Sequence, residues 1–107
     1  MKLSIKNRLN FGVFYPQEGN ITTQLLVKDI AGKVNLTQDE ITTIELKQAD
    51  TQITWNEEKA KDKEIEFTEA ELNFLKEQIS KLDGENKISQ EILDTCLLVR
   101  DYKKEVL

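Results

Sequence analysis

A short pattern of apolar and hydroxyl residues recurs four times along the chain and predicts four helix starts. Each copy has an apolar residue, then Thr or Ser, and then an apolar residue four positions after the hydroxyl. The hydroxyl oxygen can accept a hydrogen bond from a free backbone N–H of the first helical turn, while the apolar pair packs across it. The four hydroxyl residues are Thr22, Thr37, Thr68 and Ser89, and Glu40 and Glu71 complete capping boxes with Thr37 and Thr68. The expected helices lie near residues 22–31, 37–43, 68–82 and 89–105.

Two glycines and two apolar stripes agree with these helices. Gly32 and Gly84 follow the first and third helices, where glycine tolerates the left-handed conformation of a C-cap. In the third helix an apolar stripe runs from Leu72 to Leu82 at steps of three and four, and the last helix has a similar stripe from Ile92 to Val106. Because such stripes are typical of helices that pack on a core, we expect the last two helices to form a helical hairpin.

The hydrophobic period changes to two between the second and third of these helices. Ala49 and Asp50 suit a turn, and the charged run 56–64 has no apolar period, so it reads as a solvated hairpin loop. The pattern therefore predicts a three-stranded antiparallel meander that packs on the helices. The alternating apolar pairs are Ile44 and Leu46, Ile53 and Trp55, and Ile65 and Phe67.

The N-terminal segment fits two structures. Ile5, Leu9 and Val13 suit one face of a helix that breaks at Pro16, whereas Leu3 and Ile5 alternate as in a short strand. We favour the helix. The sequence as a whole then predicts a single α+β domain over residues 1–107, mainly helical with about five helices and with the small meander in the middle of the chain.

Charge and hydropathy bear on where the protein acts. No stretch approaches the roughly 20 apolar residues that a membrane helix needs, and residues 1–10 lack a signal-peptide core, so we expect a cytoplasmic protein without membrane contact. The net charge is −5, and it is unevenly distributed. Residues 1–34 hold five basic and two acidic groups (+3), whereas residues 35–107 hold ten basic and eighteen acidic groups (−8). Such asymmetry concerns association and solubility, not fold.

The residue types present leave little catalytic or metal chemistry. The chain has no histidine and one cysteine, which removes the commonest general base and a structural zinc site. Cys96 lies in an apolar helical run, so we expect a buried, reduced thiol and not a redox or nucleophilic residue. Near Asp83, Lys87 and Ile88 stand where a calcium loop needs an oxygen ligand and a glycine. The four glycines are isolated, so no phosphate-binding loop is present. The sequence thus predicts no enzyme, no cofactor and no metal site.

Nucleic-acid binding is an alternative function. Two short helices around Gly32, followed by a hairpin, have the order of a winged helix-turn-helix with residues 37–43 as the recognition helix. That helix carries Asp39 and Glu40 and no Lys or Arg, which disfavours contact with phosphates. A modest basic edge could come from Lys28, Lys33, Lys59, Lys61 and Lys63. The converse alternative, an acidic surface that imitates nucleic acid, is weakened by the ten interspersed basic residues.

Short elements from about Leu9 to Tyr102 give the chain an overall pattern similar to that of a known group of proteins. Those elements are Pro16-Gln17-Glu18-Gly19-Asn20, Leu26-Val27-Lys28-Asp29-Ile30, Asp39-Glu40-Ile41, Leu46-Lys47, Trp55-Asn56 and Lys81-Leu82-Asp83. In these the chain resembles small uncharacterised proteins of phage and prophage origin. The resemblance brings no activity, ligand or site residues, and it implies a viral accessory protein that acts inside a bacterial cell.

We therefore expect a non-enzymatic protein that works by binding another protein, for example as a phage accessory or host-modulating factor. Phe11, Phe14 and Tyr15, next to Pro16, are the candidate contact residues if their side chains are exposed, because aromatic residues are enriched at interface hot spots. The alternative is that they cap the core. A small enzyme that uses carboxylates is the third functional class, and the sequence leaves the partner and the oligomeric state open.

Overall fold

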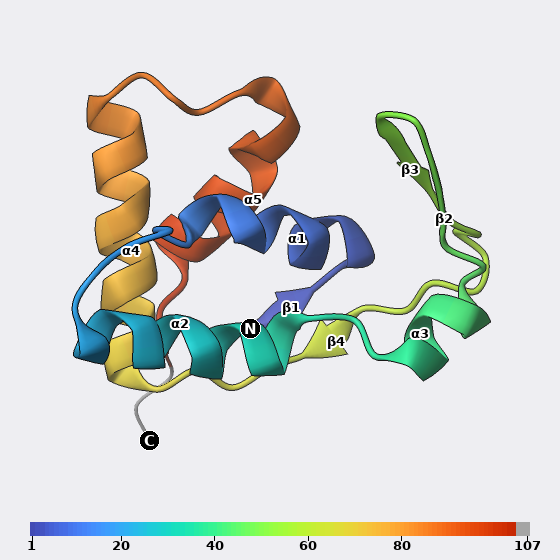
Figure 1. Ribbon diagram of the computed structural model, residues 1–107, viewed down its shortest axis with the longest axis horizontal. Helices are drawn as coiled ribbons and strands as arrows, with labels where there is room; N and C mark the ends of the chain where they lie inside the picture. The colour runs from blue at the N-terminus through green and yellow to red at the C-terminus, as the bar shows by residue number, and fades with distance from the viewer. Residues whose placement is uncertain (105–107) are drawn as a thin grey trace.

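The computed structural model describes residues 1–104, and over these the chain is an α+β protein in which helices dominate (Figure 1). In chain order the elements are β1 (Lys2–Leu3), α1 (Ile5–Asn10), the 3₁₀-helix η1 (Phe11–Phe14), α2 (Ile21–Val34), α3 (Gln38–Thr43), β2 (Lys47–Ala49), β3 (Gln52–Thr54), β4 (Lys63–Glu64), α4 (Glu69–Gly84) and α5 (Gln90–Asp101). The predicted fold class is confirmed, whereas several helix ends and the strand pairing differ from prediction.

The two complete capping boxes begin helices as predicted. At the start of α3, the Thr37 hydroxyl accepts a bond from the N–H of Glu40 (3.1 Å) and the Glu40 carboxylate accepts one from the N–H of Thr37 (3.0 Å). Thr68 and Glu71 make the same reciprocal pair at the start of α4, at 3.1 and 2.8 Å. Ser89 occupies the N-cap position of α5, but its side chain makes no capping bond.

Helix α2 starts earlier than predicted, because its N-cap lies two residues before Thr22. Asn20 is the N-cap, and its side-chain oxygen accepts a bond from the N–H of Thr23 (2.8 Å), so Thr22 lies inside the helix. Asn is at least as good an N-cap as Thr, which explains why it takes the position. Ile21 consequently lies on the first turn, where its side chain is 81% exposed instead of packing on Leu26.

The helix ends at the two glycines were predicted wrongly. Gly32 lies inside α2, which continues to Val34, and Gly84 is the last residue of α4. Neither glycine has a positive φ. The chain leaves α4 through Asn86, which has φ 57° and whose N–H donates to the Asp83 carbonyl (3.1 Å). Asn tolerates the left-handed conformation, so the end of the helix moves past the glycine.

Alanine at the two helical glycines is expected to stabilise the protein. A Cβ at Gly32 or Gly84 would meet no atom within 4 Å, and alanine loses less backbone entropy on folding. Each of Gly32→Ala and Gly84→Ala should raise the free energy of unfolding by about 0.5–1 kcal/mol, measured by urea denaturation. Gly19→Ala is the control, because its Cβ would lie 3.2 Å from the Gln24 amide nitrogen. An unchanged midpoint in the double alanine variant would contradict these helix assignments.

The last helix is shorter than predicted. Helix α5 ends at Asp101, and the next residue, Tyr102, is extended with φ −67° and ψ 132°. The predicted continuation of the helix through residues 102–104 is therefore wrong. The part of the prediction that falls on Glu105 and Val106 lies outside the described residues.

The predicted three-stranded meander is wrong, because the strands form two separate two-stranded sheets. Strands β2 and β3 form the predicted hairpin, which turns at Asp50 and Thr51. Strand β4 pairs instead with β1, antiparallel. The reason is burial: Ile65 and Phe67, which follow β4, are 4% and 3% exposed in the main core, and this draws their segment away from the hairpin toward the N-terminus. Both structures proposed for the N-terminal segment occur in turn, first β1 and then α1.

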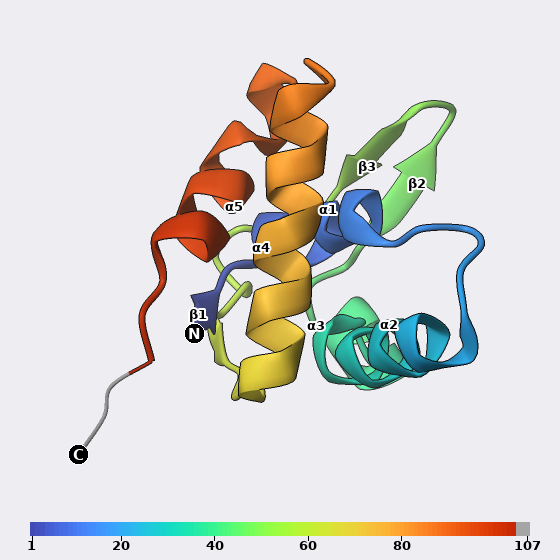
Figure 2. The same cartoon turned by 90° about the vertical axis from the view of Figure 1, so that its left-hand side faces the viewer.

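The core lies around α4, which has α5 on one side and α2 on the other (Figure 2). Leu75 and Val99 are fully buried there, as the helical stripes of α4 and α5 predict, and Ile30 and Val34 of α2 are fully buried beside them. Strand β1 and the 3₁₀-helix η1 close the core with Leu3 and two phenylalanines. Among the described residues, no helix combines the length and apolar character needed to cross a membrane.

Candidate functional site

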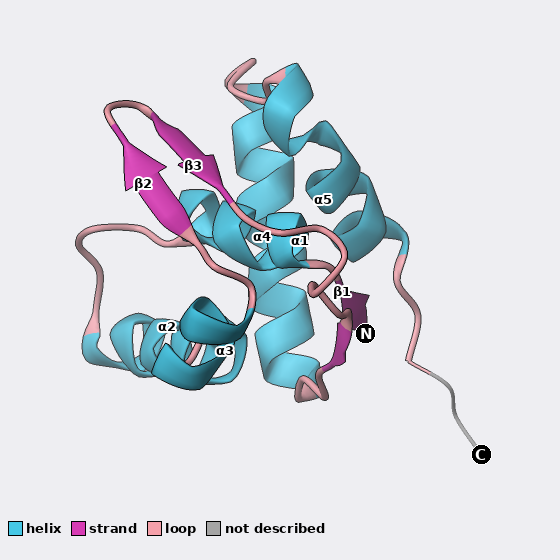
Figure 3. Ribbon diagram, turned by 90° about the vertical axis from the view of Figure 1, so that its right-hand side faces the viewer, coloured by secondary structure: helices cyan, strands magenta, loops and turns pink. Residues whose placement is uncertain are grey.

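A groove of about 520 Å³ lies between the β2–β3 hairpin and the helices α1 and α5. Its walls are Lys6, Leu9 and Asn10 of α1, residues 51–55 of the hairpin, and Glu91 at the start of α5. The whole of β3 lines the groove and no residue of β2 does, in agreement with the position of β3 on the inner side of the hairpin (Figures 2 and 3). Its volume is within the range of ligand-binding clefts.

The wall formed by α1 is fixed to α5 by side-chain amides. Ser4 caps α1 in a reciprocal pair with Asn7, at 3.1 and 3.0 Å. The Asn7 amide then donates to the fully buried hydroxyl of Thr95 (2.9 Å). The Asn10 amide donates to the same hydroxyl and to the backbone carbonyl of Glu91, both at 3.2 Å. These bonds join two walls of the groove, α1 and the start of α5.

Among the described residues, the bonds that anchor the hairpin wall lie at its base. The chain leaves α3 through Glu45, which has φ 55°, and the N–H of Asn56 donates to the carbonyl of the buried Ile44 (2.7 Å). Lys59 pairs with the Glu45 carboxylate at 3.0 Å. Every residue of β2 and β3 is exposed, and the hairpin projects from the body (Figure 3). A two-stranded hairpin of this kind has little stability of its own.

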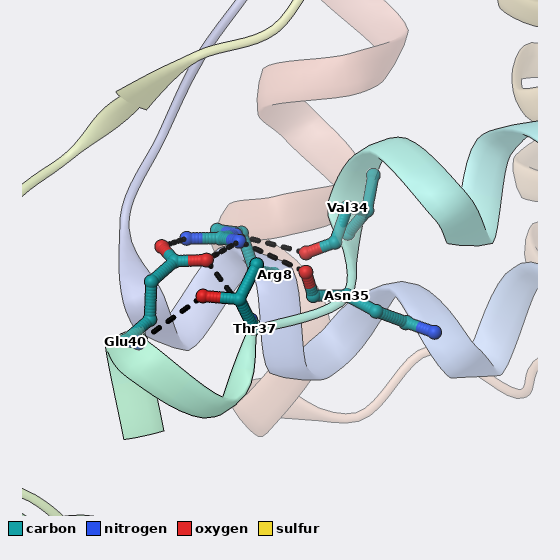
Figure 4. Close-up of polar contacts among 5 residues, drawn as sticks. All are labelled: Arg8, Val34, Asn35, Thr37 and Glu40. Carbon is teal, nitrogen blue, oxygen red and sulfur yellow. Dashed lines mark hydrogen bonds and ion pairs between the residues drawn. The ribbon is translucent and has the colours of Figure 1, made fainter. Parts of the chain in front are cut away.

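A buried arginine joins α1, α2 and α3 (Figure 4). The Arg8 side chain comes from α1, is fully buried, and donates to the carbonyls of Val34 (2.8 Å) and Asn35 (3.1 Å) at the end of α2. It also donates to both carboxylate oxygens of Glu40 in α3, at 2.5 and 2.9 Å. One guanidinium thus satisfies the free carbonyls of one helix end and the acidic first turn of the next.

The Glu40 carboxyl has a strongly lowered pKa. The hydrogen bonds from Arg8, together with the one from the Thr37 N–H, stabilise the ionised form. They outweigh the opposing effect of burial and lower the pKa of Glu40 from 4.5 to about 2. Because the pKa in the folded state is lower than in the unfolded state, ionised Glu40 stabilises the fold above pH 4.5, and this contribution is lost as the pH falls toward 2.

Glu40→Gln is therefore expected to lower the free energy of unfolding at pH 7 and to have a progressively smaller effect below pH 4.5. The measurement is urea denaturation of both proteins at a series of pH values between 7 and 3. In an Arg8→Met background, where the donor is missing, the pH dependence of the difference should shrink. A difference between Glu40 and Gln that stays constant over this range would contradict the assignment.

The second capping-box glutamate also binds a cation. Glu71 is 3% exposed and its carboxylate lies 2.6 Å from the Lys33 ammonium of α2. Burial acts to raise the pKa of Glu71, but the hydrogen bonds from Lys33 and from the Thr68 N–H outweigh it and lower the pKa. The ammonium also lies 5.8 Å from the ring centre of Phe67. This pair fixes α2 against the start of α4, in the way that Arg8 fixes α3.

The aromatic residues predicted as contacts lie elsewhere. Phe11 and Phe14 are each 1% exposed, and Phe11 packs edge-on against Phe14 (5.3 Å) and stacked on Phe67 (6.0 Å). The 3₁₀-helix η1 places the two rings three residues apart on one inward face. Tyr15 is half-buried against the core, and burial raises its pKa to about 12. The prediction required exposed rings, so for Phe11 and Phe14 the alternative, capping of the core, is correct.

The described residues offer little acid–base or metal chemistry. Cys96 is buried and unpaired as predicted, and burial raises the pKa of its thiol. The groove holds a single carboxylate, that of Glu91. A second hollow of about 300 Å³ holds Asp39 and Glu40, but the Glu40 carboxylate is bound by Arg8. Within residues 1–104 no three Cys, Asp or Glu side chains come together to hold a metal ion.

Comparison of the chain with protein-family models, with curated proteins and with solved structures gives no match. The resemblance to phage and prophage proteins therefore stays a prediction.

Sequence reasoning missed the residues that line the groove. One local signal was present: residues 51–55, Thr-Gln-Ile-Thr-Trp, have no charged side chain in a chain that is 33% charged. The α1 wall had no such signal, because Lys6, Leu9 and Asn10 become part of a groove only when the hairpin folds beside them.

Proposed function

We propose that this chain is a non-enzymatic protein that acts by binding another protein, and that the partner occupies the groove between β3 and α1. The observation that supports this most is the state of β3: each of its residues is exposed and uncharged, and the strand is paired on one side only and lies along the groove. Soluble proteins usually protect such an edge with charges, with proline or with a covering element. A partner segment in the groove would cover it.

The resemblance to phage and prophage proteins supplies the setting of this proposal. In this setting the chain is an accessory or host-modulating protein that works in the bacterial cytoplasm and binds a host or viral protein. The mixed surface charge and the lack of histidine fit a protein that presents a surface better than one that performs acid–base catalysis.

Binding to nucleic acid has less support. Two of the five lysines in the basic edge, Lys33 and Lys59, each bind a carboxylate. Helix α3, the recognition helix of that alternative, has only six residues and carries Asp39 and Glu40. Binding of duplex DNA is therefore one of the results that would contradict the proposal in the test below.

The test is photocrosslinking from two matched positions. A diazirine-bearing lysine analogue replaces either Lys6, in the groove, or Lys81, on the exposed end of α4, and each protein is irradiated in lysates from a panel of bacteria. The expected result is one protein captured from position 6 and not from position 81. After purification it should bind the unmodified chain in calorimetry and bind Ile53→Asp much more weakly. Equal capture from both positions, or salt-dependent binding of a labelled DNA duplex without any captured protein, would contradict the proposal.

A further inference from the structure

We propose, on the basis of this function, that the partner contributes an extended peptide segment that adds to the free edge of β3 as a third strand. The register of the hairpin pairs Ala49 with Gln52 across a two-residue loop, and it pairs Gln48 with Ile53. Because residues that flank a two-residue loop exchange both backbone bonds, Gln48 and Ile53 form a non-hydrogen-bonded pair. The N–H and C=O of Ile53 therefore point away from β2.

These outward groups of Ile53 face the groove. All three residues of β3 line it and none of β2 does, so the groove runs along the edge of β3 that is not paired. An extended peptide in this position accepts a hydrogen bond from the Ile53 N–H with one of its carbonyls. One of its N–H groups donates to the Ile53 carbonyl, as in other cases of strand addition to a sheet edge. A third strand also gives the hairpin support that two strands alone lack.

The two edges of the hairpin differ in their protection. Strand β2 carries Lys47, whereas β3 and both flanking positions, residues 51–55, carry no charge and no proline. Lysine on an edge strand is a common guard against pairing with other chains. The guarded edge faces solvent and the unguarded edge faces the groove, which is the arrangement that a binding edge requires.

The opposite wall of the groove indicates the chemistry of the segment. Lys6 and Asn10 lie one turn apart on α1, and the Asn10 amide binds the Glu91 carbonyl, so Lys6 and Glu91 mark opposite ends of this wall. The ion pairs among the described residues involve neither of these two side chains. Leu9 and the partly exposed Ile53 lie along the groove with them. The matching segment is extended, with an apolar residue in the middle, an acidic residue toward Lys6 and a basic residue toward Glu91.

The experiment uses a displayed library of random twelve-residue peptides, panned against the whole chain. The strongest binders are synthesised with a fluorescent label, and their affinities are measured by anisotropy for the native sequence, for Ile53→Pro and for Gln48→Pro. Ile53→Pro removes an outward N–H at the groove edge, and Gln48→Pro removes one at the opposite edge. Neither substitution removes a hydrogen bond between β2 and β3. Heteronuclear NMR spectra confirm that both variants are folded, and Ile53→Ala, which keeps the N–H, separates the backbone effect from loss of the side chain.

We expect Ile53→Pro to weaken binding by about three- to tenfold relative to Ile53→Ala, as loss of one hydrogen bond implies, and Gln48→Pro to leave it unchanged. Lys6→Glu should select peptides in which the acidic position is replaced by a basic one. Equal affinities for Ile53→Pro and Ile53→Ala would overturn strand addition while leaving protein binding in the groove intact. Failure of the photocrosslinking as well would overturn both. Self-association of the chain that Ile53→Pro abolishes would show that a second copy occupies the edge and would also overturn the proposal.

Discussion

Arg8→Met is expected to lower the free energy of unfolding by about 3–5 kcal/mol, the range for breaking a buried ion pair. The guanidinium is fully buried and its hydrogen bonds go to Glu40 and to the carbonyls of Val34 and Asn35. Methionine fills much of the volume but donates to none of these acceptors, and the Glu40 carboxylate then keeps only the bond from the Thr37 N–H. Since domains of this size are stable by only about 5–15 kcal/mol, such a loss should be visible as a large shift of the urea midpoint.

Arg100→Met is the matched control for this prediction. Arg100 also binds a carboxylate, that of its neighbour Asp101 at 2.9 Å, but both side chains are more than half exposed. Exposed pairs contribute little to stability, so we expect no measurable change. Arg8→Lys keeps the charge but cannot reproduce the fork of donors, and should fall between the two. Equal midpoints for Arg8→Met and Arg100→Met would show that Arg8 does not hold the helices together.

Phe11→Ala is the second variant with a large expected effect, a loss of about 3–5 kcal/mol in the free energy of unfolding. The ring is 1% exposed and packs against both Phe14 and Phe67. Its removal leaves a cavity where η1 meets the start of α4, and it also removes two aromatic contacts. The change is measured by urea denaturation followed by circular dichroism.

Val13→Ala provides the comparison within the same 3₁₀-helix. Val13 is 44% exposed, so its truncation should change stability by less than about 0.5 kcal/mol. The pair also separates the two interpretations of the aromatic segment. If Phe11→Ala were as stable as Val13→Ala but lost partner binding, the ring would belong to a contact surface and its place in the core would be wrong.

The features predicted correctly from the sequence are those with a local cause. The capping boxes at Thr37 and Thr68 join residues three positions apart, and the hairpin turn at Asp50 joins neighbouring strands. Even here competition between near neighbours decided the details. Asn20 displaced Thr22 as a cap, and Asn86 displaced Gly84 as the left-handed residue. Local rules identify such elements better than they identify their ends.

The features that were missed depend on contacts between distant parts of the chain. Strand β4 pairs with β1, about sixty residues away, because Ile65 and Phe67 are buried beside the N-terminus. Arg8 stands four residues after the Ser4 cap, where the recurrent pattern has an apolar residue, so its burial could not be read from hydropathy. It is buried because its bonding partners arrive from α2 and α3 after folding.

The candidate site combines both kinds of feature. The uncharged segment 51–55 is visible in the sequence, but the alternation of Ile53 and Trp55 predicts a strand with one buried face, and Ile53 is in fact 42% exposed. The groove also needs α1, and the position of α1 depends on the bonds of Asn7 and Asn10 to Thr95. No pattern along the chain links those residues.

Amide hydrogen exchange of Ile53 and Gln48, measured by NMR with and without a selected peptide, shows whether a third strand adds to the edge of β3. Both N–H groups point out of the hairpin, at opposite edges, and both should exchange quickly in the free protein. We expect the bound peptide to slow exchange at Ile53 and to leave the exchange rate at Gln48 unchanged. Slowed exchange at Gln48 instead, or no change at either residue with the peptide bound, would contradict it.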